Sequence, residues 1–358
     1  MRKVLFCAFL CLVAGLSAAE AWSGKSIVVE RGAAETCATL PDGVRFPEGI
    51  TANPHTDQIY VSTFDFGPNP NKLLRYSEHC HLLAVRDFGG TPLLGLAFNQ
   101  KDHKVYIANF GLSKIQRIAA NFHAGTPVED VATIPGIGAP GNRTETNNPD
   151  GSTDTIIFGS NKFPAPNALT FNKAGDLFVS DSFQGAIWKI SNADGCATPC
   201  PVDLVKQDPL LATAGFPPFG ANGIAFNGDE SQLFIANTGD DRILSLPMGG
   251  GSITVLAESI NGADGVEFRH GRLWVAANQA DEIVVLSTTG RVLAKLGDFL
   301  GIRGDGSPRG LLFPASLVIV DGWIYVTNLA IPLTGGDEPE ADVTKWTISR
   351  IRIPDDLP

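Results

Sequence analysis

Short apolar segments alternate with polar turns along most of this chain, and the same arrangement recurs six times. A representative unit is GANGIAFNGDESQLFIANT, which begins at Gly220. A short alternating segment is followed by a turn rich in Asn, Asp and Gly, and a second apolar segment then ends in a polar residue. Alternation with a period of two, bounded by turn residues, is typical of half-buried antiparallel strands. The six units begin at Phe46, Pro92, Ala165, Gly220, Gly262 and Phe313.

A third and a fourth strand are expected downstream of most units. Four antiparallel strands that recur every ~40–50 residues are the pattern of a propeller blade, and six copies close into a ring around a channel. A solenoid is the alternative, but solenoids need capped ends and usually have shorter repeats. We therefore predict an all-β fold, a six-bladed β-propeller. The expected third strands are 186–190, 242–246 and 282–286, and the fourth strands are 202–206, 253–257 and 292–296.

The two ends of the chain are expected to complete one blade together. The last unit supplies two strands and then the segment 344–353, which leaves one strand missing. The segment 35–40, just before the first unit, can fill that gap and remove the exposed edges. The prediction is one propeller domain over residues 25–358, closed by strands from both termini.

The beginning of the chain predicts export. A basic pair is followed by an apolar run over residues 4–16 and then by small residues. This is the pattern of a secretory signal peptide over residues 1–21, with cleavage after Ala19 or Ala21. The run is too short to span a bilayer, which takes ~20 residues, and no other segment is long and apolar enough. We expect a secreted or periplasmic protein without a membrane span.

Charge and cysteine content narrow the picture further. The formal net charge of -11 argues against nucleic acid or an anionic membrane as partner, so a small-molecule substrate is expected. Four cysteines remain after the signal peptide, and in an oxidising compartment they allow three disulfide connectivities. Cys196 and Cys200 flank a short turn, so we favour a bridge between them, and Cys37 with Cys80 follows by elimination. A zinc site is the weaker alternative, because no second close Cys or His pair accompanies them.

Two long insertions interrupt the repeats, at residues 137–163 and 331–344. Loops of this length are usually functional or mobile. The first leads directly into the third inner strand, so we expect it to overhang the channel mouth as a lid, with an inert surface loop as the alternative. The mouth should be partly apolar, because five phenylalanines are expected near it: Phe64, Phe110, Phe163, Phe216 and Phe219.

The position just before each inner strand carries the most informative side chains. The innermost strands of a propeller run side by side around the axis, so these residues form a ring at one face. Two carboxylates and two amide carbonyls among them suit a hard cation such as calcium better than zinc or copper. Turn formation is the alternative role for Asn and Asp beside Gly, but it does not account for Glu48. In order, the six positions hold Glu48, Leu94, Asn167, Asn222, Asp264 and Ala315.

This pattern resembles the SMP-30/gluconolactonase-like family, whose members are calcium-dependent six-bladed propellers related to regucalcin, diisopropyl fluorophosphatase and paraoxonase. The resemblance covers nearly all of the mature chain. In that family the four polar positions bind the catalytic metal, which implies Ca²⁺ or another hard divalent cation here. Paraoxonases have a histidine where this chain has Leu94, and none of its six histidines heads an inner strand. The implied ligands are Glu48, Asn167, Asn222 and Asp264.

Polar residues also end the second strands, which return to the same face. They are candidates for binding substrate, and capping of turns is the alternative. The primary candidates are Asn109, Asp181 and Asn237, and Asn278 and Asn328 occupy comparable places.

Together these features predict an exported, metal-dependent hydrolase of a lactone or related ester. Calcium would polarise the carbonyl, and Asp264 would act as general base or nucleophile through its second oxygen. Glu48 and Asp181 are the next candidates for that role. The main alternative is a non-catalytic propeller in which structural calcium stiffens the channel and the upper face binds a ligand or protein. Binding of a sugar or sugar acid without turnover is the third.

Overall fold

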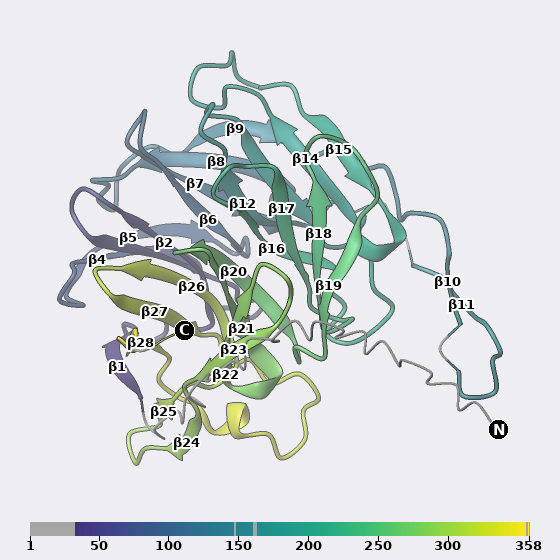
Figure 1. Cartoon of the computed structure of the whole chain (residues 1–358). Helices are drawn as coiled ribbons and strands as arrows, with labels where there is room; N and C mark the ends of the chain where they lie inside the picture. The colour runs from purple at the N-terminus through teal and green to yellow at the C-terminus, as the bar shows by residue number, and fades with distance from the viewer. Residues whose placement is uncertain (1–32, 147, 160–162, 356, 358) are drawn as a thin grey trace, which may run out of the picture.

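Six four-stranded antiparallel sheets are arranged as the blades of a ring (Figure 1). The computed structural model describes residues 33–146, 148–159, 163–355 and 357, so the predicted signal peptide lies outside the described residues. The innermost strands of the six blades contact one another in cyclic order and surround a central channel. The predicted six-bladed β-propeller is confirmed.

The strands of each blade follow one another outward from the channel. Blade 1 contains β2 (Pro47–Asn53), β3 (Gln58–Thr63), β4 (Asn71–Tyr76) and β5 (Leu82–Gly89). Blade 2 contains β6 (Leu96–Asn99), β7 (Lys104–Asn109), β8 (Lys114–Ala119) and β9 (Glu129–Thr133). Blade 3 contains β12 (Pro166–Phe171), β13 (Leu177–Asp181), β14 (Ala186–Ile190) and β15 (Asp203–Gln207). Blade 4 contains β16 (Ala221–Phe226), β17 (Gln232–Asn237), β18 (Arg242–Pro247) and β19 (Thr254–Glu258). Blade 5 contains β20 (Ala263–Arg269), β21 (Arg272–Ala277), β22 (Glu282–Ser287) and β23 (Val292–Leu296).

Blade 6 is assembled from both ends of the chain, as predicted. Its inner strands are β26 (Pro314–Val320), β27 (Trp323–Asn328) and β28 (Thr347–Arg352), and its outer strand is β1 (Ala34–Thr39). A disulfide joins Cys37 in β1 to Cys80 in the turn after β4 of blade 1. The closing strand is therefore tied to the neighbouring blade by a covalent bond as well as by its own sheet. The second predicted disulfide, Cys196–Cys200, is also present.

Burial falls from the second strand of a blade to its outer edge. In β3, β7, β17, β21 and β27 every residue after the first is buried, on both faces of the sheet. The expectation of half-buried strands is therefore wrong for these second strands, because a neighbouring blade packs on each face. Continuous apolar runs such as Val105 to Ile107 reflect this double cover. In contrast, two of the outer strands, β5 and β15, contain no buried residue.

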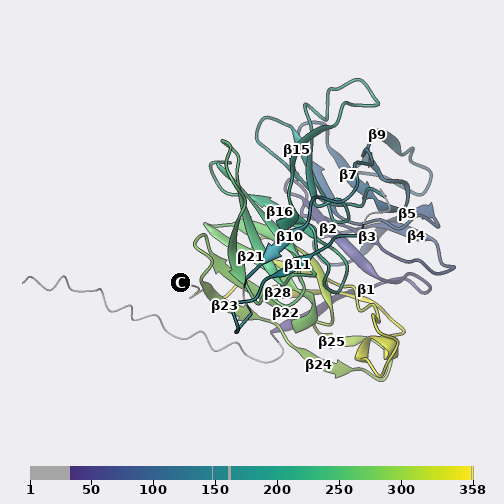
Figure 2. The same ribbon diagram turned by 90° about the vertical axis from the view of Figure 1, so that its right-hand side faces the viewer.

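Two additional hairpins extend from the ring. One is formed by β10 (Arg143–Glu145) and β11 (Asp154–Ile156) within the first insertion, and the other by β24 (Phe299–Ile302) and β25 (Pro308–Gly310). The hairpin β10–β11 projects outward from the blades (Figures 1 and 2). At its base the buried Arg143 guanidinium pairs with Asp240 of blade 4 at 2.6 Å. Arg143 also donates to the backbone oxygens of Pro209 and Ala212, so the insertion is held against the loops of blades 3 and 4 at the end where their inner strands begin.

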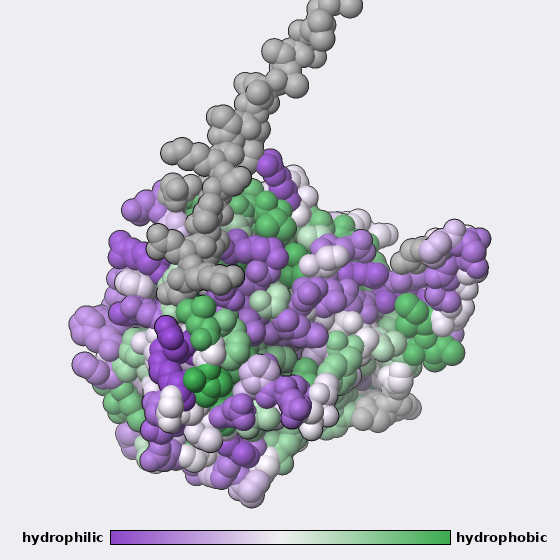
Figure 3. Space-filling view, turned by 90° about the horizontal axis from the view of Figure 1, so that it is seen from below, coloured by the Kyte–Doolittle hydropathy of each residue, from purple (hydrophilic) through white to green (hydrophobic). Residues whose placement is uncertain are grey.

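The surface mixes polar and apolar residues. On the face seen from below, hydrophilic and hydrophobic residues are interspersed among the blades (Figure 3). In the part of the chain that the structure describes, the helices are short 3-10 turns, and none is long and apolar enough to cross a membrane.

Candidate metal and substrate site

Four oxygen-donor side chains meet where the innermost strands begin. Glu48, Asn167, Asn222 and Asp264 are each the second residue of β2, β12, β16 and β20. Each is buried, with an exposed fraction between 2% and 5%. We call these four side chains the donor ring. They line a cavity at the channel mouth, and three of them also line a larger cavity in the channel below, so the ring separates the two.

A bulge at the start of the inner strand carries each ring residue. In blade 1, Pro47 pairs with Thr63 and Ile50 pairs with Val61, so Glu48 and Gly49 together lie opposite one residue of β3. The same two-against-one register occurs in blades 3, 4, 5 and 6. Bulges redirect side chains and are common beside functional sites. The repeat thereby places one side chain per blade at the same level of the channel.

The residue after the ring position is small because neighbouring inner strands approach closely there. A Cβ at Gly223 would lie 2.2 Å from the backbone oxygen of Asp264, and one at Gly49 would lie 2.3 Å from that of Leu94. Any larger side chain would push the strands apart. The Glu-Gly, Asn-Gly and Asp-Gly pairs of the sequence therefore reflect crowding at the ring in addition to turn preference.

Hydroxyl groups fix the orientation of the two ring amides. Thr238 Oγ1 donates to the backbone oxygen of Ala263 at 2.7 Å, so its oxygen is left to accept from Asn222 Nδ2, at 2.9 Å. Ser182 does the same in the preceding blade. Its hydroxyl donates to Ala221 at 2.7 Å and accepts from Asn167 Nδ2 at 2.9 Å. With each NH₂ group bonded to a hydroxyl of its own blade, the two amide oxygens remain available to the ring.

The two ring carboxylates destabilise each other when both are charged. Burial, together with the charge of Asp264, raises the pKa of Glu48 well above its usual range. Burial raises the pKa of Asp264 to about 7, although hydrogen bonds from Asn278 and Asn222 lower it part of the way. Glu48 Oε2 is buried and lacks a hydrogen-bond partner among the described residues, whereas Asp264 Oδ2 accepts from Asn278 at 3.0 Å. A cation would compensate this charge and supply the missing partner.

The donor set fits a hard divalent cation. Carboxylate and amide oxygens are the ligands that calcium takes in proteins. Within the described residues no group of three or more His, Cys, Asp or Glu could hold a metal, so a metal here depends on the two amides. None of the histidines lines either cavity, in agreement with the sequence. Cys37, Cys80, Cys196 and Cys200 are all in disulfides, which excludes the zinc alternative for them.

The cavity above the ring, which we call the mouth cavity, has a volume of about 190 Å³. Apart from the ring donors, Thr238 and Asn278, its walls are apolar. Two of the expected phenylalanines, Phe64 and Phe219, line it, but Phe110, Phe163 and Phe216 do not. The apolar walls consist of Phe64, Phe66, Leu94, Pro217, Phe219, Phe313, Leu329, Ile331 and Leu333.

The two insertions take different parts at the channel mouth. No described residue of the first insertion lines the mouth cavity, but Phe158 and Gly159 line a neighbouring cavity together with Ser182, which supports the donor ring. The second insertion, after β27, supplies Ile331 and Leu333 to the wall instead. The second insertion thus contributes to the wall of the mouth cavity, and the described part of the first lies beside it.

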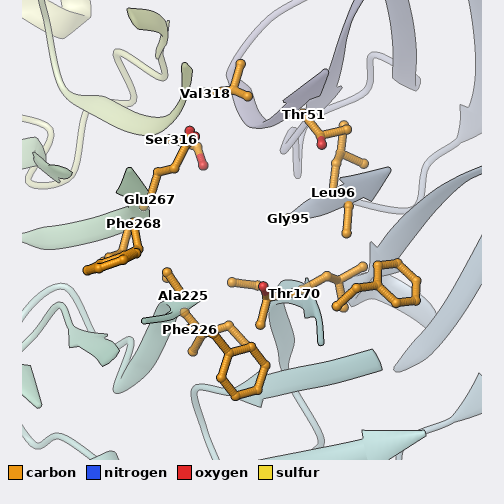
Figure 4. Close-up of a pocket in the computed structure, with 18 of the residues that line it drawn as sticks. Thr51, Gly95, Leu96, Thr170, Ala225, Phe226, Glu267, Phe268, Ser316 and Val318 are labelled. Carbon is orange, nitrogen blue, oxygen red and sulfur yellow. The ribbon is translucent and has the colours of Figure 1, made fainter. Parts of the chain in front are cut away.

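The channel below the ring opens into a cavity of about 520 Å³, lined by the inner strands of all six blades (Figure 4). Its notable side chain is Glu267 of β20, whose carboxylate accepts from the backbone N–H of Ile319 at 2.8 Å. Burial raises the pKa of Glu267 to about 7. In blade 1 the equivalent contact, to Phe98 N–H, is made by the neutral hydroxyl of Thr51. Sequence reasoning missed Glu267 because it lies inside a strand.

The three primary candidates for substrate binding are engaged within the fold and do not line the mouth cavity. Asp181 accepts hydrogen bonds from Ala165 N–H, Gln184 and Trp188. Asn109 bonds to Gln116 and caps the turn at Leu112, and Asn237 donates to the backbone of Leu210 and Ala212. Contact with substrate would require these bonds to break, so the geometry favours the alternative role in turns.

The polar residues that do support the ring lie one position further along. Ser182 follows Asp181, Thr238 follows Asn237, and Asn278 is at the equivalent place in blade 5. Each is hydrogen-bonded to the ring residue of its own blade. Asn278 was among the candidates, but Ser182 and Thr238 were missed. An alignment of the repeats that places Asn278 opposite Ser182 and Thr238, directly after the second strand, would have identified this shared position.

No protein-family model and no curated protein sequence matches this chain. Solved structures match in fold. A luciferin-regenerating enzyme is 13% identical over 86% of this chain and 92% of that chain, with a TM-score of 0.60. Regucalcin from Agrobacterium tumefaciens, a calcium-binding protein, is 13% identical over 88% and 93%, with a TM-score of 0.57. A gluconolactonase from Xanthomonas campestris is 13% identical over 88% of each chain, with a TM-score of 0.52.

This chain has the fold of the SMP-30/gluconolactonase-type propellers. The resemblance inferred from the sequence is thus confirmed for the architecture. At 13% identity, shared fold does not decide the chemistry of an individual propeller. That chemistry depends on the donor ring and the mouth cavity.

Proposed function

We propose that this protein is an exported, metal-dependent hydrolase of a lactone or related ester. One observation carries the proposal: two buried carboxylates and two oriented amide oxygens meet at the floor of a cavity, and Glu48 Oε2 has no partner among the described residues there. Glu48, Asn167, Asn222 and Asp264 would hold Ca²⁺ or another hard divalent cation. The similar structures, which include a gluconolactonase and a calcium-binding regucalcin, support this direction.

When bound, the cation would supply Lewis acidity that polarises the substrate carbonyl. Asp264 would accept a proton from the attacking water, or attack the carbonyl carbon itself. Asn278 holds Asp264 Oδ2 at 3.0 Å and so fixes the plane of the carboxylate. Glu48 would serve mainly as a metal ligand and is the second candidate for the base. The apolar walls would limit access of bulk water to the reacting groups.

Export supports the choice of calcium, because extracellular and periplasmic proteins meet higher calcium concentrations than cytosolic ones. The two disulfides fit an oxidising compartment. A panel of lactones and aryl esters, assayed with calcium and then with excess chelator, tests the proposal. We expect turnover that chelator abolishes and that added calcium restores. Turnover that is insensitive to chelator would overturn the metal dependence. Calcium binding without any turnover would overturn the hydrolase, and the non-catalytic propeller would take its place.

A further inference from the structure

The mouth cavity offers a substrate almost no polar group beyond the donor ring. Among the described residues that line it, only six are polar, and four of these are the ring itself. Of the other two, Thr238 Oγ1 bonds to Asn222 and Ala263, and Asn278 Nδ2 bonds to Asp264, which leaves Asn278 Oδ1 as an unpaired acceptor among the described residues. No lysine, arginine or histidine of the described chain lines this cavity. A substrate whose body carries several hydroxyls would lose their hydrogen bonds to water. It would find at most one acceptor on the walls in exchange, so its binding would be unfavourable.

The cavity is also small. A volume of about 190 Å³ is less than the ~300–1,000 Å³ of sites for drug-sized ligands. Rings and branched side chains from four different segments enclose it, including Phe64, Phe219, Phe313 and Leu333. Apolar groups of a ligand gain free energy in proportion to the area that such walls remove from water.

We infer that the substrate is a small lactone or ester with an alkyl or aryl body, and not a polyhydroxylated sugar lactone. The inference rests on the proposed function for the lactone or ester group, which would meet the donor ring. It goes further because the apolar walls of the cavity indicate the chemical class of the rest of the substrate. A chain with this fold therefore need not act on the sugar lactone for which the similar gluconolactonase is named.

Phe66 is the specificity-determining residue that can be tested most cleanly. It lies between β3 and β4, lines the mouth cavity and is 64% exposed, which is unusual for a phenylalanine. Its ring packs edge-to-face on Phe64, with centroids 4.7 Å apart, and on Phe110, at 5.9 Å. Phe216 is a matched control, because it is 54% exposed but does not line the cavity. Truncation of either ring should leave folding intact, since both are at the surface.

Two pairs of compounds test the inference. δ-Octalactone and glucono-δ-lactone share a six-membered lactone ring and differ in the body, which is alkyl in one and polyhydroxylated in the other. Their lactams resist hydrolysis, so calorimetric binding of the lactams in the presence of calcium reports on the walls without turnover. We expect δ-octalactone to have the higher kcat/KM, and its lactam to bind about tenfold tighter than gluconolactam or better. Phe66→Ala should weaken binding of the alkyl lactam about threefold to tenfold, and Phe216→Ala less than about twofold.

The outcomes separate this inference from the proposed function. If neither lactone is hydrolysed but the alkyl lactam is preferred, the hydrolase fails while the assignment of an apolar ligand stands. If gluconolactam binds as tightly as the alkyl lactam, or glucono-δ-lactone is the better substrate, the inference is overturned whatever the reaction. Equal effects of Phe66→Ala and Phe216→Ala would overturn the role of Phe66 as a wall of the site.

Discussion

The two halves of the channel mouth differ although they are built from the same repeat. In blades 3, 4 and 5 the ring residue is hydrogen-bonded to a polar residue that follows the second strand. In blades 6, 1 and 2 the residue after the second strand is apolar. The polar pairs are Asn167–Ser182, Asn222–Thr238 and Asp264–Asn278, and the corresponding pairs in the other half are Ala315–Leu329, Glu48–Phe64 and Leu94–Phe110.

This difference largely separates the two tasks of the site. The polar half provides oriented oxygen atoms, and the apolar half, together with Pro217 and Phe219 from the loop before β16, provides the walls that contact the body of a substrate. Glu48 is the exception, because it is a charged donor in the apolar half with no polar residue beside it in its own blade. Its Oε2 is accordingly without a partner in the described part of the chain, and its pKa is raised well above the usual range by burial and by Asp264. We expect Glu48 to be the donor whose environment changes most when a cation binds.

The largest effect should come from Asp264, the donor-ring carboxylate of the polar half. Asp264→Asn keeps one oxygen that can serve as a ligand but removes the reactive carboxylate. We expect hydrolysis of δ-octalactone to fall by roughly 10²–10⁴, the usual contribution of a positioned acid–base group, while calcium affinity falls only modestly. Steady-state kinetics and calorimetry on the same preparation measure both. Full activity with calcium bound would place the base elsewhere, with Glu48 the next candidate.

Glu48→Gln should affect the stability of the fold in opposite directions without and with calcium. Since the pKa of Glu48 is raised above its ordinary 4.5, the stability linked to this group is present below that pH and is lost as pH rises through the folded-state pKa. Without metal at about pH 8, Glu48→Gln should therefore stabilise the fold. With saturating calcium it should instead destabilise, because it weakens the site. Urea unfolding with chelator and with calcium measures both, and the same sign in both conditions would contradict this role.

The hydroxyl that orients Asn222 should contribute to metal affinity without touching the metal. Thr238→Val preserves shape and removes the acceptor, so the amide is free to turn its oxygen away. We expect calcium affinity to fall about tenfold. Thr238→Ser is the matched control, because it keeps the hydroxyl, and it should bind calcium within about twofold of the wild type. Equal affinities for the Val and Ser variants would show that Thr238 does not orient the amide.

The smallest effect should come from Glu267, a channel carboxylate outside the donor ring. Its pKa is raised to about 7, so the linked stability is present below about pH 4.5 and is lost as pH rises through 7. Glu267→Gln retains an acceptor for Ile319 N–H and should stabilise the protein at about pH 8, with little effect at about pH 4. Calcium affinity should not change. A weaker calcium site in this variant would mean that the ring extends further down the channel.

Much of the architecture follows from local patterns. The third strands expected at 186–190 and 282–286 form at Ala186–Ile190 and Glu282–Ser287, because turn residues bound the apolar segments closely. The six ring positions follow from the repeat alone, since a bulge of the same register recurs in five blades.

The remainder depends on contacts between distant segments. The path of the first insertion is set by the ion pair of Arg143 with Asp240, which no local pattern encodes. Ser182 and Thr238 are ordinary hydroxyl residues in the sequence, and their role arises only from the backbone carbonyl of the next blade that fixes their protons. Glu267 resembles any exposed strand residue until the channel encloses it.

The most direct test of the account is a crystal structure of the mature protein grown with calcium. We expect one cation bound by oxygens of Glu48, Asn167, Asn222 and Asp264 at about 2.3–2.6 Å, between the mouth cavity and the channel below. The amide nitrogens of Asn167 and Asn222 should remain on Ser182 and Thr238. A donor ring that holds no cation at saturating calcium, or amides with their nitrogens turned inward, would contradict it.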